Sequence, residues 1–99
     1  MQMEPEVVKN PQKRQFEIQL GSELGLLAYR ERPGQIDLMH TEVPPSHRSQ
    51  GIGEKLVRFA LGYAKQHQLS VIPTCKFVRA YLKRHPDEAI IEGIGSGGS

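Results

Sequence analysis

A helical pattern between two strand-like segments is the feature that most restricts the fold. From Ile52 to about Gln68, apolar residues recur every three or four positions, the period of an amphipathic α-helix. The flanking segments 36–43 and 69–74 are short, apolar runs typical of strands. Because a strand–helix–strand crossover makes its strands parallel neighbours, we expect a βαβ unit in this half of the chain.

The segments before this unit predict antiparallel strands. Residues 13–20 alternate apolar and polar side chains, the period of a half-buried strand. A second candidate strand, 24–31, follows a Gly-Ser-Glu turn, and a turn containing Pro33-Gly34 leads into the third strand, 36–43. Three short strands joined by tight turns predict an antiparallel meander.

The third strand determines which polar side chains share a face. Strict alternation places His40 on one face with Ile36 and Leu38, and it places Asp37, Met39 and Thr41 on the other. Pro44-Pro45 then ends the strand, because proline has no N–H to donate to a ladder.

The chain of 99 residues is long enough for one domain. We predict a loose lead-in at 1–12, a domain at 13–86, and a partly mobile tail at 87–99 in which 89–91 form a weak apolar patch. A second helix is expected at 76–85, ended by Pro86. The predicted fold class is α/β (α+β): a small, mostly antiparallel sheet with a parallel βαβ end and two helices.

Composition excludes several classes of function. With 37% hydrophobic residues, 24% charged residues and a net charge of +2, the chain lacks the dense basic stripe typical of nucleic-acid binders. It has no apolar run of the ~20 residues that span a membrane and no secretory pattern, so we expect a cytoplasmic protein. We expect a monomer or a weak dimer. The single cysteine, Cys75, rules out an internal disulfide and a cysteine-rich zinc site, and we expect no bound metal.

The turn that opens the long helix is a candidate phosphate site. Arg48-Ser49-Gln50-Gly51-Ile52-Gly53 follows a strand and leads into a helix whose first N–H groups have no internal partner. The helix dipole adds partial positive charge, glycines let a ligand approach the backbone, and Arg48 can pair with a phosphate. Alternatively, Gly51 and Gly53 only shape the start of the helix.

These six residues resemble the Arg/Gln-x-x-Gly-x-Gly/Ala signature of the GNAT acetyltransferase superfamily. The longer strings HTEVPPSHRSQGIGEKLVRFAL and PTCKFVRAYLKRHP resemble the short single-domain branch of that superfamily. The resemblance extends from Lys13 to Pro86. It implies a GNAT-like fold, acetyl-CoA as the acyl donor and transfer of an acetyl group to an amine.

The resemblance also implies where acetyl-CoA binds. In GNAT proteins the strand before the signature and the next parallel strand splay apart, and the pantetheine arm lies between them. Pro73 fits this arrangement because it removes a ladder donor where the strands should part, although it could simply end its strand. The implied contacts are Glu42 and Val43 on the pantetheine strand, and Arg48, Gln50, Gly51, Ile52 and Gly53 at the pyrophosphate. Ser49 belongs to the same turn, and Lys55, in the helix that follows, could contact a CoA phosphate.

Tyr81 and Cys75 are candidates for chemistry. Many GNAT enzymes carry a tyrosine that protonates the departing CoA thiolate, and Tyr81 lies in the matching segment; alternatively it is a core residue. Cys75 precedes a helix and Lys76, which favour its thiolate, so it could accept an acetyl group. It could also be an inert buried residue or form a mixed disulfide with CoA.

His40 and Glu42 are candidate general bases. If His40 faces Cys75, it could activate the thiol or the incoming amine; if not, it is a structural sheet histidine. Glu42 could act through a water, and backbone N–H groups near Val43 could polarise the thioester carbonyl.

Two alternatives to an enzyme remain open at this stage. GNAT enzymes normally carry additional N-terminal helices that shape the acceptor site, and the chain has no room for them before Lys13. The acceptor site is therefore expected to be open and catalysis weak, with an acceptor amine that the sequence does not name. The alternatives are a non-catalytic CoA-binding module, acting as a sensor or carrier, and an interaction domain with an anion-binding turn.

Overall fold

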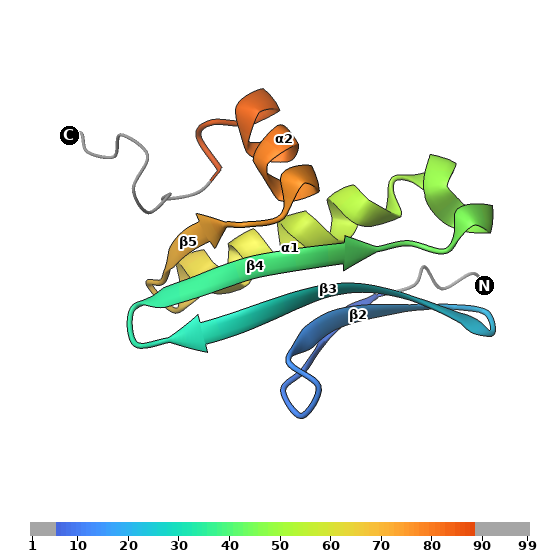
Figure 1. The fold of residues 1–99 in the computed structure, drawn as a ribbon, viewed down its shortest axis with the longest axis horizontal. Helices are drawn as coiled ribbons and strands as arrows, with labels where there is room; N and C mark the ends of the chain where they lie inside the picture. The colour runs from blue at the N-terminus through green and yellow to red at the C-terminus, as the bar shows by residue number, and fades with distance from the viewer. Residues whose placement is uncertain (1–5, 89–99) are drawn as a thin grey trace.

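A computed structural model of the chain describes residues 6–88. These residues form one five-stranded sheet whose spatial order follows the sequence, β1-β2-β3-β4-β5, with both α-helices against the same face (Figure 1). The elements are β1 (Val7–Asn10), β2 (Gln15–Leu20), β3 (Glu23–Arg32), β4 (Gln35–Glu42), the 3-10 helix η1 (Pro45–Gln50), α1 (Ile52–Gln66), β5 (Ser70–Pro73) and α2 (Lys76–Arg84).

The pairing of the strands confirms the predicted α+β class. Strands β2, β3 and β4 form an antiparallel meander, and β4 and β5 are parallel neighbours on either side of the α1 crossover. The β4–β5 ladder begins at Gln35↔Ser70 and ends at Leu38↔Pro73. Because β5 itself ends at Pro73, the structure fits both interpretations of this proline, as the point where the two strands part and as a simple strand end.

The lead-in prediction is wrong for residues 7–10, which form the edge strand β1. This strand pairs antiparallel with β2, and Val7 lies opposite Ile18 and packs partly against the core. Pro5 and Pro11 flank the strand instead of interrupting it, so they leave its hydrogen bonds intact. Four residues are too few to give a clear alternating pattern, which explains the error.

Lys9 ties this edge strand to α1 and β3. Its Nζ donates a hydrogen bond to the Tyr63 hydroxyl at 2.7 Å and lies 3.5 Å from Glu31 Oε1. The Tyr63 hydroxyl in turn donates to the Glu31 carboxylate at 3.0 Å. The hydrogen bond to Tyr63 raises the pKa of Lys9, against a smaller lowering by burial. The ammonium therefore stays charged and holds β1 in place.

Replacing Lys9 with methionine should lower the free energy of unfolding by about 1 kcal/mol, because the stem is kept while the charged donor is lost. Urea denaturation measures the change. Lys13→Met, at an exposed side chain near the same strand, is the control and should leave stability unaltered. Equal effects from the two substitutions would contradict the role of Lys9.

A β-bulge in β4 reverses the predicted orientation of His40. Leu38 pairs with Tyr29 and His40 pairs with Ala28, so β4 advances two residues while β3 advances one, and Met39 is the extra residue. His40 is consequently exposed on the helix-free face, whereas Leu38 is buried under the helices. The expectation that His40 shares a face with Ile36 and Leu38 is wrong.

The core fixes the start of α1 against the sheet. Ile52, the first residue of α1, is buried and packs near Gly25 of β3. A Cβ on Gly25 would lie only 3.3 Å from Ile52 Cγ2 and 3.0 Å from Ile18 Cγ2. The absence of a side chain at this position of β3 thus lets the helix begin close to the strands, beside the end of β4.

Candidate functional site

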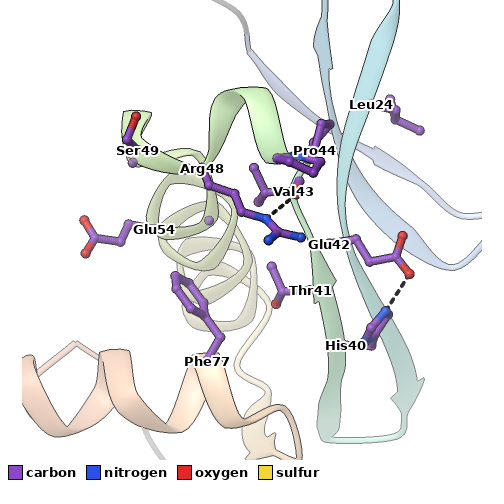
Figure 2. Close-up of a pocket in the computed structure, with 13 residues that line it drawn as sticks. Leu24, His40, Thr41, Glu42, Val43, Pro44, Arg48, Ser49, Glu54 and Phe77 are labelled. Atoms are coloured by element: carbon purple, nitrogen blue, oxygen red, sulfur yellow. Dashed lines mark hydrogen bonds and ion pairs between the residues drawn. The ribbon is translucent and has the colours of Figure 1, made fainter.

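A cleft of about 860 Å³ lies where β4 leaves β5, bounded by the end of β4, by η1 and by the first turns of α1 and α2 (Figure 2). Its walls come from segments that are distant in the sequence. The lining residues are Leu24, His40, Thr41, Glu42, Val43, Pro44, Pro45, Arg48, Ser49, Gly51, Gly53, Glu54 and Phe77.

The cleft exists because β4 continues beyond its pairing with β5. The last β4–β5 pair is Leu38↔Pro73, but β4 extends to Glu42. After Pro73 the chain turns away, and the Cys75 N–H donates to the Leu38 carbonyl at 2.9 Å as α2 begins. The edge of β4 from Met39 onward is therefore not paired with β5.

The start of α1 supplies free backbone donors. Within residues 6–88, the N–H groups of Ile52, Gly53 and Glu54 have no hydrogen-bond acceptor, and no side chain caps the helix. These amides carry the positive end of the helix dipole. The Glu54 carboxylate pairs with Arg84 at 3.3 Å, which partly offsets its negative charge near these amides. The arrangement suits an anion.

The two glycines of the turn have different structural roles. Gly51 has φ +72°, a left-handed conformation that glycine adopts readily, and a Cβ built there would meet nothing within 4 Å. A Cβ on Gly53 would lie 2.7 Å from Phe77 Cζ. The first glycine therefore leaves open space in the cleft, while the second gives room to a ring from α2.

Side chains anchor η1, the segment that carries Arg48. Ser46 Oγ donates to Glu23 Oε1 at 2.8 Å, and His47 Nε2 lies 3.5 Å from the same oxygen. His47 Nδ1 and Gln50 Oε1 are 3.0 Å apart within η1. The Arg48 side chain reaches back to β4, and its Nε donates to the Val43 carbonyl at 3.1 Å (Figure 2).

The cleft brings together most of the cofactor contacts that the resemblance implies. Glu42, Val43, Arg48, Ser49, Gly51 and Gly53 line it. Gln50, Ile52 and Lys55 are not among the lining side chains, and Ile52 belongs to the core. For Ile52, this leaves the backbone N–H as the group that a ligand can reach.

His40 and Glu42 form a close pair on the helix-free side of the cleft. Their side chains are 59% and 61% exposed, and His40 Nε2 lies 2.6 Å from Glu42 Oε2. Figure 2 shows both side chains pointing away from Thr41 and Phe77. A carboxylate on one ring nitrogen fixes the orientation of the imidazole and leaves Nδ1 for proton transfer.

Cys75 lies on the other side of the sheet from His40. Its side chain is buried, at 9% exposure, and Sγ is 3.3 Å from Thr41 Oγ1, so Thr41 occupies the position next to the thiol that the sequence suggested for His40. The expected alternation fails at the Met39 bulge. The condition for a Cys75–His40 pair, that the two residues face each other, is therefore not met.

The environment of Cys75 nonetheless favours its thiolate. Burial raises the pKa of the thiol, but hydrogen bonds from the Thr41 side chain and from backbone N–H groups of Phe77 and Val78 outweigh it and lower the pKa below the usual thiol value. The backbone donors lie in the first turn of α2, where the helix dipole also stabilises negative charge.

Alkylation of Cys75 by iodoacetamide should show a pH midpoint below that of a free thiol, since the thiolate is the reacting form. Thr41→Val should shift the midpoint upward, because it removes the hydroxyl donor while keeping a β-branched side chain. Rates measured across pH by intact mass give both midpoints. A midpoint in Thr41→Val at or below that of the wild type would contradict the role of the hydroxyl.

Tyr81 is a core residue in the structure. It is 1% exposed, its hydroxyl donates to Glu88 Oε1 at 2.7 Å, and it does not line the cleft. Burial and the hydrogen bond to Glu88 raise the pKa of the phenol, which weakens it as an acid near neutral pH. The position agrees with the core alternative, and proton donation by Tyr81 stays a prediction.

Sequence reasoning missed Thr41 and Phe77 as parts of the site. Phe77 lies in the first turn of α2, and its ring is 38% exposed and lines the cleft against Gly53. The available signal was the combination of Gly53 at the start of one helix with Phe77 at the start of the next, because a glycine can make room for an aromatic ring. Thr41 carried no local signal, because its orientation depends on the bulge.

Within residues 6–88, no group of three or more His, Cys, Asp or Glu side chains could hold a metal ion. The helices in the same range are too short or too polar to cross a membrane.

Comparison with known proteins gives a family and a fold. A sequence model of GCN5-related N-acetyl-transferases matches residues 15–91. Protein NATD1 of Mus musculus is 35% identical over 87 residues, which cover 84% of this chain and 78% of that protein. Protein NATD1 of Gallus gallus is 33% identical over 93 residues, with 90% and 84% covered.

A solved structure has the same fold. The solution NMR structure of a GCN5-like protein from Staphylococcus aureus superposes with a TM-score of 0.71, covers 94% of this chain and 93% of its own, and is 23% identical. The shared architecture is a mostly antiparallel five-stranded sheet with its helices.

Proposed function

The chain belongs to the GCN5-related N-acetyltransferase family, and we propose that it binds acetyl-CoA in the cleft and transfers the acetyl group to an amine. One observation carries the proposal. A single cleft joins the uncapped start of α1 and Arg48 to the exposed His40–Glu42 pair, at the point where β4 and β5 separate. An anion site and a candidate base thus share one opening.

The donor-binding side of the cleft fits a diphosphate. The N–H groups of Ile52, Gly53 and Glu54 are available donors, and Gly51, which directly precedes them, leaves open space in the cleft. Arg48 adds a positive charge at the same end. The unpaired end of β4 at Glu42, together with Val43 directly after it, would hold the pantetheine arm.

Acetyl-CoA would supply the activated acetyl group. The residues of the chain would then position the amine and remove its proton. In the tautomer that donates Nε2–H to Glu42, His40 Nδ1 accepts the proton, and the carboxylate stabilises the charged ring that results. The Val43 N–H is the last backbone donor before Pro44 and Pro45, and it would polarise the thioester carbonyl.

Direct attack by the amine fits the geometry better than transfer through Cys75. The His40–Glu42 pair lines the cleft, whereas the Cys75 sulfur is buried beside Thr41 and does not line it. We expect Cys75→Ala to keep most of the acetyltransferase activity. Intact mass after incubation with acetyl-CoA should show no lasting acetyl group on the wild-type protein. An acetyl adduct that Cys75→Ala abolishes, together with loss of turnover, would instead establish the cysteine route.

The acceptor side of the cleft is open. His40 and Glu42 lie on the helix-free face of the sheet, and both are more than half exposed. A non-catalytic CoA-binding module would share the donor side with the enzyme. A panel of amines assayed for CoA release separates the two: turnover that His40→Gln diminishes supports the transferase, and tight CoA binding without turnover on any amine supports the module.

A further inference from the structure

We propose that Arg48 determines specificity by excluding thioesters that lack a diphosphate. In the free protein its guanidinium covers the Val43 carbonyl, just past the end of β4, that a pantetheine arm would use, and only a diphosphate draws it away. The inference rests on the proposed function, since it concerns the same cleft.

The contact that carries the inference is the bond from Arg48 Nε to the Val43 carbonyl at 3.1 Å. Figure 2 shows the guanidinium reaching from η1 across the cleft to β4. Val43 directly follows the part of β4 that has lost its partner β5, and both residues line the cleft. The guanidinium therefore occupies the space in front of an edge carbonyl inside the proposed donor site.

A pantetheine arm carries amide N–H groups, and an unpaired strand edge binds such groups through its carbonyls. An arm that reaches Val43 must first displace Arg48. A ligand without a diphosphate offers the displaced guanidinium no anionic partner, so the exchange costs a charge-assisted hydrogen bond. A ligand with a diphosphate replaces that bond with a stronger one between opposite charges.

The side chain, and not its segment, is the part that can move. Ser46 and His47 hold η1 to Glu23 at the β2–β3 turn, with contacts of 2.8 Å and 3.5 Å. Arg48 itself is exposed, and within residues 6–88 its terminal nitrogens Nη1 and Nη2 have no hydrogen-bond partner. A rotation of the side chain toward the start of α1 would bring these nitrogens to the proposed diphosphate site.

The test compares two ligands on two variants by calorimetry. Coenzyme A carries the diphosphate, and pantetheine carries the arm without it. Arg48→Met, which keeps the length but removes the donor and the charge, should bind coenzyme A at least ~10-fold more weakly and pantetheine about 3- to 10-fold more tightly than the wild type. Arg32→Met, at an exposed arginine near the far end of β3, removes the same charge and should change neither affinity.

In Arg48→Met the affinity for coenzyme A should fall while the affinity for pantetheine rises. A simple anion contact would lower the first affinity and leave the second unchanged. Coenzyme A binding that weakens in Arg48→Met, with pantetheine affinity unchanged or lower, would overturn the role of Arg48 and leave the proposed function standing. A wild-type protein that binds no coenzyme A would overturn both. The ¹H–¹⁵N signal of Arg48 Nε gives an independent readout: it should shift with coenzyme A and stay in place with pantetheine at the same concentration.

Discussion

Gly51→Val is expected to lower the affinity for coenzyme A at least ~10-fold, or about 1.4 kcal/mol. Gly51 lines the cleft, and a side chain built on it enters space that holds no other protein atom. Gly51 directly precedes the first N–H groups of α1, where the diphosphate is proposed to bind. Calorimetric titration with coenzyme A measures the loss.

The same substitution has a second effect that a control must separate. Gly51 has φ +72°, so valine there strains the backbone and should destabilise the fold by about 1–2 kcal/mol. Gly34, in the β3–β4 turn, has φ +77° and equally open surroundings, but it does not line the cleft. Gly34→Val should share the loss of stability and keep coenzyme A affinity. Similar affinity losses in both variants would show that strain alone is responsible.

Replacement of His40 by glutamine is expected to lower kcat for acetyl transfer about 100-fold, the usual scale for loss of a general base. Glutamine can still hydrogen-bond Glu42 but cannot accept a proton near neutral pH. Because His40 lies on the helix-free side of the cleft, away from Arg48 and α1, coenzyme A affinity should not change. The effect should therefore appear in kcat at saturating acetyl-CoA.

Glu42→Gln should give a smaller loss, about 10-fold, because the imidazole remains while the charge that stabilises its protonated form is gone. His67→Gln, at the C-terminal end of α1, is the histidine control and should leave kcat unaltered. Full activity in His40→Gln would rule out the base and favour another route, such as attack through Cys75.

The features that the sequence predicted correctly depend on local signals. The helical period after Ile52 and the double proline after the third strand are each recognisable within a few residues, and they suffice to predict the βαβ unit and the end of β4. The candidate anion turn was recognisable for the same reason, because its arginine and its two glycines lie within six residues at the start of α1.

The features that sequence-based prediction missed depend on the pairing of strands that are distant in the sequence. The bulge at Met39 is a property of the register between β3 and β4, and no residue type near it marks the extra position. It places Thr41 beside Cys75 and turns His40, together with Glu42, to the opposite face. Strand β1 likewise becomes visible only through its partners, since four residues hold too little pattern.

The central claim is that the uncapped first turn of α1 binds the diphosphate of coenzyme A. Titration of ¹⁵N-labelled protein with coenzyme A, followed by amide NMR, tests it directly. The largest downfield shifts should fall on the N–H signals of Ile52, Gly53 and Glu54. The fragment 3′-phosphoadenosine 5′-diphosphate, which keeps the diphosphate but lacks the pantetheine arm, should shift the same three signals and leave that of Glu42 in place. Saturating coenzyme A that leaves the three α1 amides unmoved, while signals shift elsewhere, would contradict it.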